Sequence, residues 1–147
     1  MDHFPRILLV EDSPDDIELI TSSLGAFHIT NRIDVVRDGA EALEYLECRG
    51  RYATRDSGTP AFVLLDLKLP KISGLEVLQR LRANPALRTV PVVVLTSSRE
   101  EPDLERAYEL GTNAYVVKPV KFDEFAKAVK EIGLFWAVLN ATPPRRN

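Results

Sequence analysis

The sequence of 147 residues has a single cysteine, no long apolar segment and no excess of basic residues. One cysteine, Cys48, excludes an intrachain disulfide and a cysteine-based metal cluster. No apolar run approaches the roughly 18 residues of a membrane span, and the N-terminus lacks the apolar stretch of a secretory signal. A net charge of −3 argues against general binding to nucleic acid or anionic membranes. These absences predict a soluble, cytoplasmic protein with no nucleic-acid or membrane partner.

The composition is typical of one globular domain. Hydrophobic residues make up 45% of the chain and charged residues 28%, which distinguishes it from a disordered chain. A length of 147 residues fits one domain and is too short for two ordinary ones. We therefore predict a single domain over residues 1–147.

Short, mostly apolar runs alternate with segments of helical periodicity. The runs predict strands that are buried on both faces of a sheet, and they comprise residues 6–10, 32–36, 62–66, 90–95 and 114–117. The helical segments follow each strand, at residues 14–24, 40–46, 74–82, 104–110 and 122–139. Five strands that alternate with five helices predict an α/β fold with a parallel sheet covered on both faces. The polar stretch 49–60 is expected to be a surface loop.

The first helix begins with residues that suit a helix N-terminus. Ser13 can cap the helix, Pro14 fits its first turn, and the carboxylates of Asp15 and Asp16 favour its positive end. We interpret both acids as helix-start residues with a structural role.

Polar side chains stand at the ends of four predicted strands. Glu11 and Asp12 follow the first strand, Asp66 ends the third, Thr96 follows the fourth and Lys118 follows the fifth. Because ligands bind at the carboxyl ends of parallel strands, these side chains are candidates for one site. Three neighbouring acids need either a cation or raised pKa values, and oxygen ligands without His or Cys suit Mg²⁺. The set provides what phosphoryl transfer requires, and one carboxylate could itself accept the phosphoryl group.

Four segments together resemble the response-regulator receiver domains of bacterial two-component signalling. They have the order and spacing of that family, and they are Leu8–Asp12, Leu64–Pro70 with Gly74, Val93–Thr96 and Ala114–Pro119. The resemblance covers about residues 6–132, which would form the domain core, and leaves about 133–147 as a C-terminal helix extension and tail. It implies a flavodoxin-like (βα)5 doubly wound sheet with strand order 2-1-3-4-5.

The resemblance also implies how the acids act. Asp66 would be the phosphoacceptor, which takes a phosphoryl group from a phosphohistidine of a sensor histidine kinase. Glu11, Asp12, Asp66 and the main-chain carbonyl of Lys68 would hold Mg²⁺. The protein would be a switch rather than an enzyme, with at most self-dephosphorylation.

Three further residues would read the phosphorylation state, according to the same resemblance. Thr96 and Lys118 would contact phosphoryl oxygens, and Tyr115 would be the aromatic residue that turns inward as Thr96 moves. Lys68 and Ser98 would flank the exposed side of the phosphoryl group and tune its hydrolysis. A local change of charge is sufficient to bias such a two-state element.

The last predicted helix carries an apolar stripe that continues beyond the expected edge of the domain. Phe135, Trp136 and Leu139 extend it, which makes them candidates for a homodimer interface, unless the tail folds back on its own domain. The residues after Ile132 are too few for an attached DNA-binding domain, so we expect output through a partner. The loop 49–60 and this tail also resemble stand-alone regulators that pair with bacterial phytochromes, which implies a phytochrome-type kinase.

Two other classes of protein, a phosphohydrolase and a mononucleotide binder, are alternatives to a receiver. A small Mg²⁺-dependent phosphohydrolase with an aspartyl nucleophile usually has a second Asp two residues later, where this chain has Lys68. A flavodoxin-like mononucleotide binder would need a phosphate-binding loop after the first strand, where Glu11 and Asp12 would repel a phosphate unless a cation intervened. The phosphohydrolase is the stronger alternative.

Overall fold

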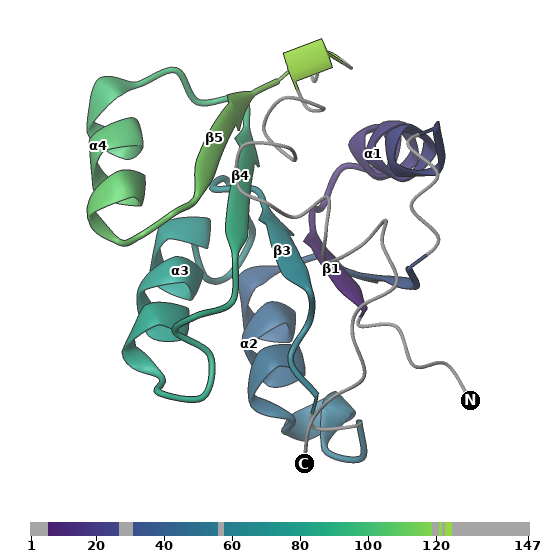
Figure 1. Cartoon of the computed structure of the whole chain (residues 1–147). Coiled ribbons are helices and arrows are strands. Elements are labelled where there is room, and N and C mark those ends of the chain that lie inside the picture. Colours follow the sequence, from purple (N-terminus) through teal and green to yellow (C-terminus); the bar gives the residue numbers. More distant parts are fainter. Residues whose placement is uncertain (1–5, 27–30, 56–57, 119–120, 122, 125–147) are drawn as a thin grey trace, which may run out of the picture.

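The computed structural model describes residues 6–26, 31–55, 58–118, 121 and 123–124. Five parallel strands form one sheet in the order β2-β1-β3-β4-β5 (Figure 1). The strands are β1 Ile7–Val10, β2 Ile33–Val36, β3 Phe62–Leu65, β4 Val92–Thr96 and β5 Ala114–Val117. The predicted flavodoxin-like α/β fold and its strand order are therefore confirmed.

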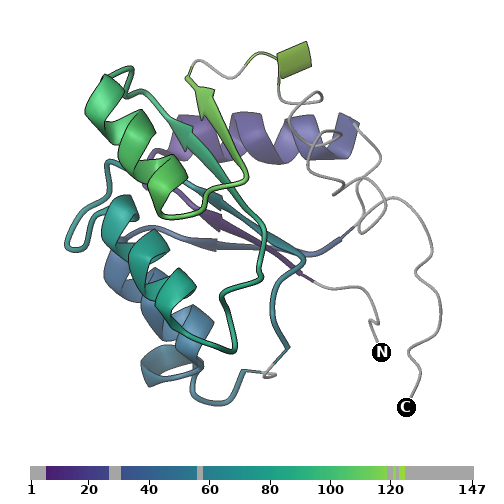
Figure 2. The same ribbon diagram turned by 60° about the vertical axis from the view of Figure 1, so that its left-hand side comes forward.

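Helices cover both faces of this sheet. They are α1 Pro14–Ala26, α2 Gly39–Glu47, α3 Gly74–Ala83 and α4 Glu101–Glu109, with a short 3₁₀ helix, η1, at Gly50–Tyr52. Figure 2 shows α1 on one face and α2, α3 and α4 on the other. The fifth predicted helix, over 122–139, lies outside the described residues except for residues 123–124, which are helical. Among the described helices, none is long and apolar enough to cross a membrane.

The central strands are apolar because helices lie above and below them. In β1, Leu8 and Val10 pack with side chains of α2 and α3, whereas Ile7 and Leu9 pack with α1. All four residues of β1 are buried, as are those of β3 and β4. Continuous apolar runs are typical of such strands, which have no solvent-facing side.

Most element boundaries lie within two residues of the prediction, and two differences are larger. Helix α4 begins at Glu101, three residues earlier than the apolar pattern predicts, because Pro102 fits the first turn, where its missing N–H costs no hydrogen bond. The predicted loop 49–60 contains η1, and there the Tyr52 hydroxyl donates to Glu41 Oε2 at 2.6 Å. Neither difference moves the residues at the carboxyl ends of the strands.

Candidate functional site

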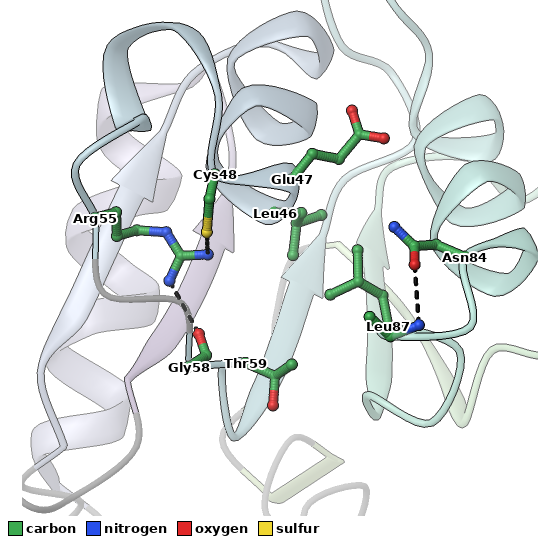
Figure 3. Close-up of a pocket in the computed structure, with 9 residues that line it drawn as sticks. Leu46, Glu47, Cys48, Arg55, Gly58, Thr59, Asn84 and Leu87 are labelled. Atoms are coloured by element: carbon green, nitrogen blue, oxygen red, sulfur yellow. Dashed lines mark hydrogen bonds between the residues drawn. The ribbon is translucent and has the colours of Figure 1, made fainter.

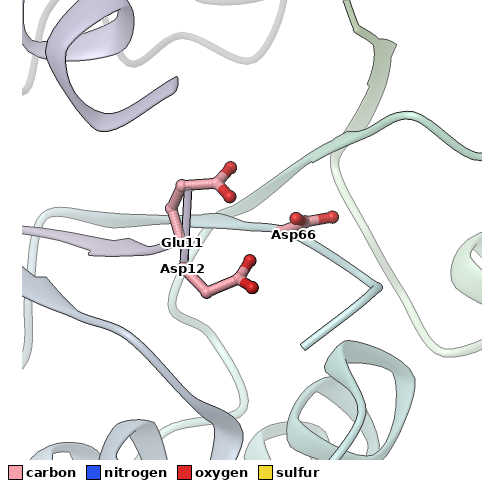
Figure 4. Close-up of side chains that lie close together, drawn as sticks. All are labelled: Glu11, Asp12 and Asp66. Atoms are coloured by element: carbon pink, nitrogen blue, oxygen red, sulfur yellow. The ribbon is translucent and has the colours of Figure 1, made fainter. Parts of the chain in front are cut away.

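Three carboxylates meet at the carboxyl end of the sheet. Figure 4 shows Glu11 and Asp12, which follow β1, beside Asp66, which follows β3. Their nearest ligand oxygens lie within 4.8 Å of one another. The strands themselves bring these residues together, since the Asp66 N–H donates to the Val10 carbonyl at 3.1 Å. Glu11 and Asp66 are buried, whereas Asp12 is exposed.

Lys118 joins this cluster from the end of β5. Its Nζ donates to Glu11 Oε1 at 2.6 Å, to Asp16 Oδ2 at 2.8 Å and to Asp66 Oδ2 at 3.3 Å. The side chain is only 11% exposed, so these ion pairs are poorly screened by water and salt. A main-chain hydrogen bond from the Lys118 N–H to the Thr96 carbonyl, at 2.8 Å, fixes the residue beside β4.

Burial sets the electrostatics of the site. Burial raises the pKa of Glu11 from its ordinary value of 4.5 to about 7, because the hydrogen bond from Lys118 offsets only part of the lost hydration and Asp66 adds repulsion. Burial alone would lower the pKa of Lys118, but hydrogen bonds to Asp16 and Glu11 and the charge of Asp66 raise it well above its ordinary value. The lysine is therefore fully charged, and the cluster retains surplus negative charge.

Asp16 is a site residue that the sequence interpretation missed. Its N–H is capped by Ser13 Oγ at 3.3 Å, so the predicted helix start is present. Its carboxylate nevertheless reaches Lys118 from the first turn of α1, although 102 positions separate the two residues in the chain. The interpretation of Asp16 as a purely structural helix-start acid is therefore incomplete. Asp15, the neighbouring acid, is exposed to solvent.

The start of α3 closely approaches the main chain at Asp66. The Gly74 N–H donates to the Leu67 carbonyl at 3.0 Å, and Ser73 caps the helix by accepting from the Glu76 N–H. A Cβ atom at Gly74 would clash with the Asp66 carbonyl oxygen and with the Leu67 Cα. Only glycine allows this contact between backbones, which explains its position eight residues after Asp66.

On the β4 side of the site, hydrogen bonds connect Thr96 to Tyr115 through Ser98. Thr96 is fully buried at the end of β4, and its Oγ1 accepts from the Ser98 N–H at 3.3 Å. The hydroxyl of the half-buried Tyr115 donates to the Ser98 carbonyl at 3.1 Å. Ser98 Oγ in turn donates to Asp103 Oδ2 at 2.6 Å, which ties this segment to α4. Sequence reasoning did not identify Asp103.

Lys68 lies at the edge of the site rather than within it. Its main-chain N–H donates to Asp66 Oδ1 at 3.2 Å, so its backbone borders the carboxylate. Its side chain is 58% exposed and pairs with Asp103 at 3.6 Å. The structure thus brings together the predicted acids and Lys118, with Thr96, Ser98, Tyr115 and Lys68 around them. The interface candidates Phe135, Trp136 and Leu139 lie outside the described residues.

The donor set fits a hard divalent cation. All three candidate ligands are carboxylates, two of them are buried, and one lysine among four nearby acids leaves negative charge to be neutralised. No His or Cys belongs to this group of described residues, and oxygen-only ligand sets favour Mg²⁺, Ca²⁺ or Mn²⁺.

A separate pocket of about 310 Å³ lies between the end of α2 and the segment after α3 (Figure 3). Thr59 and Leu87 line it near the amino ends of β3 and β4, at the opposite edge of the sheet from Asp66. Arg55 already donates to Cys48 Sγ at 3.1 Å and to the Gly58 carbonyl at 3.0 Å. This pocket therefore does not contribute to the acidic site.

Comparisons with known proteins agree on one family. The response regulator receiver domain model matches residues 7–130. Response regulator Rcp1 of Synechocystis is 42% identical over 130 residues, which cover 88% of this chain and 87% of Rcp1. The crystal structure of the Mn²⁺-bound form of response regulator Rcp1 aligns with this chain with a TM-score of 0.78. The bacteriophytochrome response regulators RtBRR and AtBRR are 55% and 56% identical, with TM-scores of 0.85 and 0.83. The alignments cover 96% and 95% of this chain and 85% and 100% of theirs.

Proposed function

Because this chain belongs to the response regulator receiver domain family, we propose that it is a phosphoacceptor switch in which Asp66 is the phosphorylated residue. The observation that carries this proposal is the position of the Asp66 carboxylate. It is buried at the end of β3, it borders Glu11 and Asp12, and it accepts a hydrogen bond from Lys118 at 3.3 Å. A carboxylate in such a place can act as a nucleophile while a neighbouring cation balances charge.

Glu11, Asp12, Asp66 and the main-chain carbonyl of Lys68 would hold Mg²⁺ in this proposal. The ion would supply positive charge that neutralises the phosphoryl oxygens. The manganese-bound form of Rcp1 supports divalent-ion binding here, and so does the set of carboxylates in this chain.

The side chains of the protein position the reacting group. An Asp66 carboxylate oxygen forms a bond to phosphorus as the bond between phosphorus and the histidine nitrogen of the kinase breaks, and the electron pair stays on the imidazole. Lys118 Nζ and the Thr96 hydroxyl donate to phosphoryl oxygens as charge redistributes. Movement of Thr96 changes its contact with Ser98, and Ser98 also accepts from Tyr115. Phosphorylation would thereby reach the surface near α4 and β5.

The partner that we propose is a sensor histidine kinase of the phytochrome type. Support comes from relatives that are more than half identical and are named as bacteriophytochrome response regulators. We further propose a homodimer through Phe135, Trp136 and Leu139. Phosphotransfer from a panel of histidine kinases tests the first proposal, and sedimentation over a range of concentrations tests the second.

Mass spectrometry after incubation with acetyl phosphate and Mg²⁺ tests the central proposal. We expect the addition of one phosphoryl group to the wild-type protein and none to Asp66→Asn, which keeps the shape of the side chain but removes the nucleophile. Asp15→Asn is the control, because it makes the same chemical change at an exposed carboxylate outside the group of Glu11, Asp12 and Asp66. Modification at another residue, or none in the wild type with Mg²⁺ present, would overturn the assignment of Asp66.

A further inference from the structure

Lys118 has three carboxylate partners, but only two of them belong to the proposed phosphorylation machinery. Glu11 and Asp66 are candidate metal ligands, and Asp66 is also the proposed acceptor. The third partner, Asp16 on α1, is outside the group of acids that converge within 4.8 Å of one another. It therefore holds the lysine without belonging to that group.

The contact between Asp16 and Lys118 is more than helix capping. Capping of α1 uses the Asp16 N–H, which donates to Ser13 Oγ, and leaves the carboxylate free for another partner. Asp15 occupies the same turn and carries the same charge, yet no partner of its carboxylate is found in the described part of the chain. Favourable interaction with the helix dipole is available to both acids, but only Asp16 contacts Lys118.

The distances show where the ammonium group lies. Nζ is 2.6 Å from Glu11 and 2.8 Å from Asp16, but 3.3 Å from Asp66. An ammonium group has three N–H donors, and these three acceptors use all of them. A phosphoryl oxygen can therefore gain a hydrogen bond from Lys118 only if the lysine weakens or gives up one of its present bonds.

We propose that Asp16 is a positioning residue that competes with the phosphoryl group for Lys118 and so favours the unphosphorylated protein. This inference rests on the proposed function of Asp66. Two effects act in the same direction. The carboxylate of Asp16 holds Lys118 Nζ towards α1. Its negative charge also repels an anionic group on Asp66, because both side chains contact the same ammonium group and water screens them poorly there.

Equilibrium binding of beryllium fluoride in the presence of Mg²⁺ tests this competition, because the bound fluoride complex imitates a phosphoryl group on a carboxylate. We expect Asp16→Asn to bind it roughly three- to tenfold more tightly than wild type, the range expected for a partly exposed charge pair. Asp15→Asn, the matched charge control, should bind within about twofold of wild type. Asp16→Glu should restore binding close to wild type, because it returns the carboxylate. Unchanged or weaker binding by Asp16→Asn would overturn the proposal.

A second measurement follows the lysine itself and needs neither metal nor phosphoryl group. In ¹⁵N–¹H spectra of the metal-free wild type, the Lys118 ammonium protons should exchange slowly with water because three acceptors hold them. Exchange should accelerate in Asp16→Asn but not in Asp15→Asn, and equal exchange in all three would contradict the contact. The controls separate the two proposals. Absence of beryllium fluoride binding in wild type would refute the phosphoacceptor, whereas binding that requires Asp66 but ignores Asp16 would refute this inference alone.

Discussion

Two lysines border Asp66, and their surroundings differ sharply. Lys118 is 11% exposed and donates to three carboxylates at 2.6 to 3.3 Å. Lys68 is 58% exposed, and one carboxylate, that of Asp103, lies 3.6 Å from its ammonium group. The charge is identical, yet water screens the second pair and is largely excluded from the first.

Both residues carry the same positive charge, so burial is what distinguishes Lys118, within the site, from Lys68 at its edge. Removal of Lys118 would leave Glu11 and Asp66 buried beside each other without their only ion-pair partner among the described residues. Lys68 can be removed at the cost of one solvent-exposed ion pair. Its main-chain N–H would still donate to Asp66 Oδ1 whatever its side chain.

Replacement of Lys118 should have the largest effect. Lys118→Met keeps much of the aliphatic volume but removes the charge that would stabilise the transferring phosphoryl group, so phosphorylation by acetyl phosphate should slow about 10²- to 10³-fold. Lys118→Arg should lie between the two proteins, since it keeps the charge in a different shape. Rates from time-resolved mass spectrometry provide the measurement. A Met variant within threefold of wild type would contradict a role for the Lys118 charge in phosphorylation.

The stability of the protein should also depend on pH, because Glu11, a partner of Lys118, is buried. The pKa of Glu11 is raised from 4.5 to about 7, so the folded protein binds more protons than the unfolded chain between these values. Stability from this group is therefore present at low pH and is lost as the pH rises through 7, by about 2 kcal/mol between pH 5 and 8.

Urea unfolding of metal-free wild type and Glu11→Gln measures this effect. The Gln variant imitates the protonated acid, so its advantage over wild type should grow with pH. Mg²⁺ should reduce the difference for wild type, because a bound cation favours the ionised carboxylate. A constant difference between the two proteins from pH 5 to 8 would mean that Lys118 fully compensates the burial of Glu11.

Replacement of Lys68 should have the smallest effect. We expect Lys68→Gln to change the free energy of unfolding by less than about 0.5 kcal/mol, and the difference should vanish at about 1 M salt, where the Debye length is roughly 3 Å. Urea unfolding at two salt concentrations is sufficient. A loss that persists at high salt would place Lys68 among the buried contacts of the site instead.

Most of the site could be predicted because the ends of buried strands can be recognised in the sequence. The apolar runs of β1, β3 and β4 identify buried strands, and parallel strands end at a common edge, so Glu11, Asp66 and Thr96 converge. The order of the strands is a different matter. An apolar run does not reveal its neighbours, and the order 2-1-3-4-5 followed from the family resemblance.

Asp16 and Asp103 escaped prediction for the same physical reason. Each lies in the first turn of a helix, where acids are common because they interact favourably with the helix dipole. Their contacts with Lys118 and Ser98 depend on where α1 and α4 lie against the sheet. Local periodicity predicts these helices, but it does not predict how they pack against the sheet. Helix α4 was also expected to begin after Asp103, which left the residue outside any element.

The close approach of Gly74 to Asp66 makes the packing around the site tighter on the α3 side than on the β4 side. On the α3 side, backbone atoms meet without room for even a methyl group, so the support beneath the acceptor is stiff. On the β4 side, single hydrogen bonds of 3.1 and 3.3 Å connect Ser98 with Tyr115 and Thr96, and these can lengthen or exchange at small cost. A displacement at Asp66 would therefore meet less resistance on the β4 side than on the α3 side, where glycine at position 74 permits the close backbone contact.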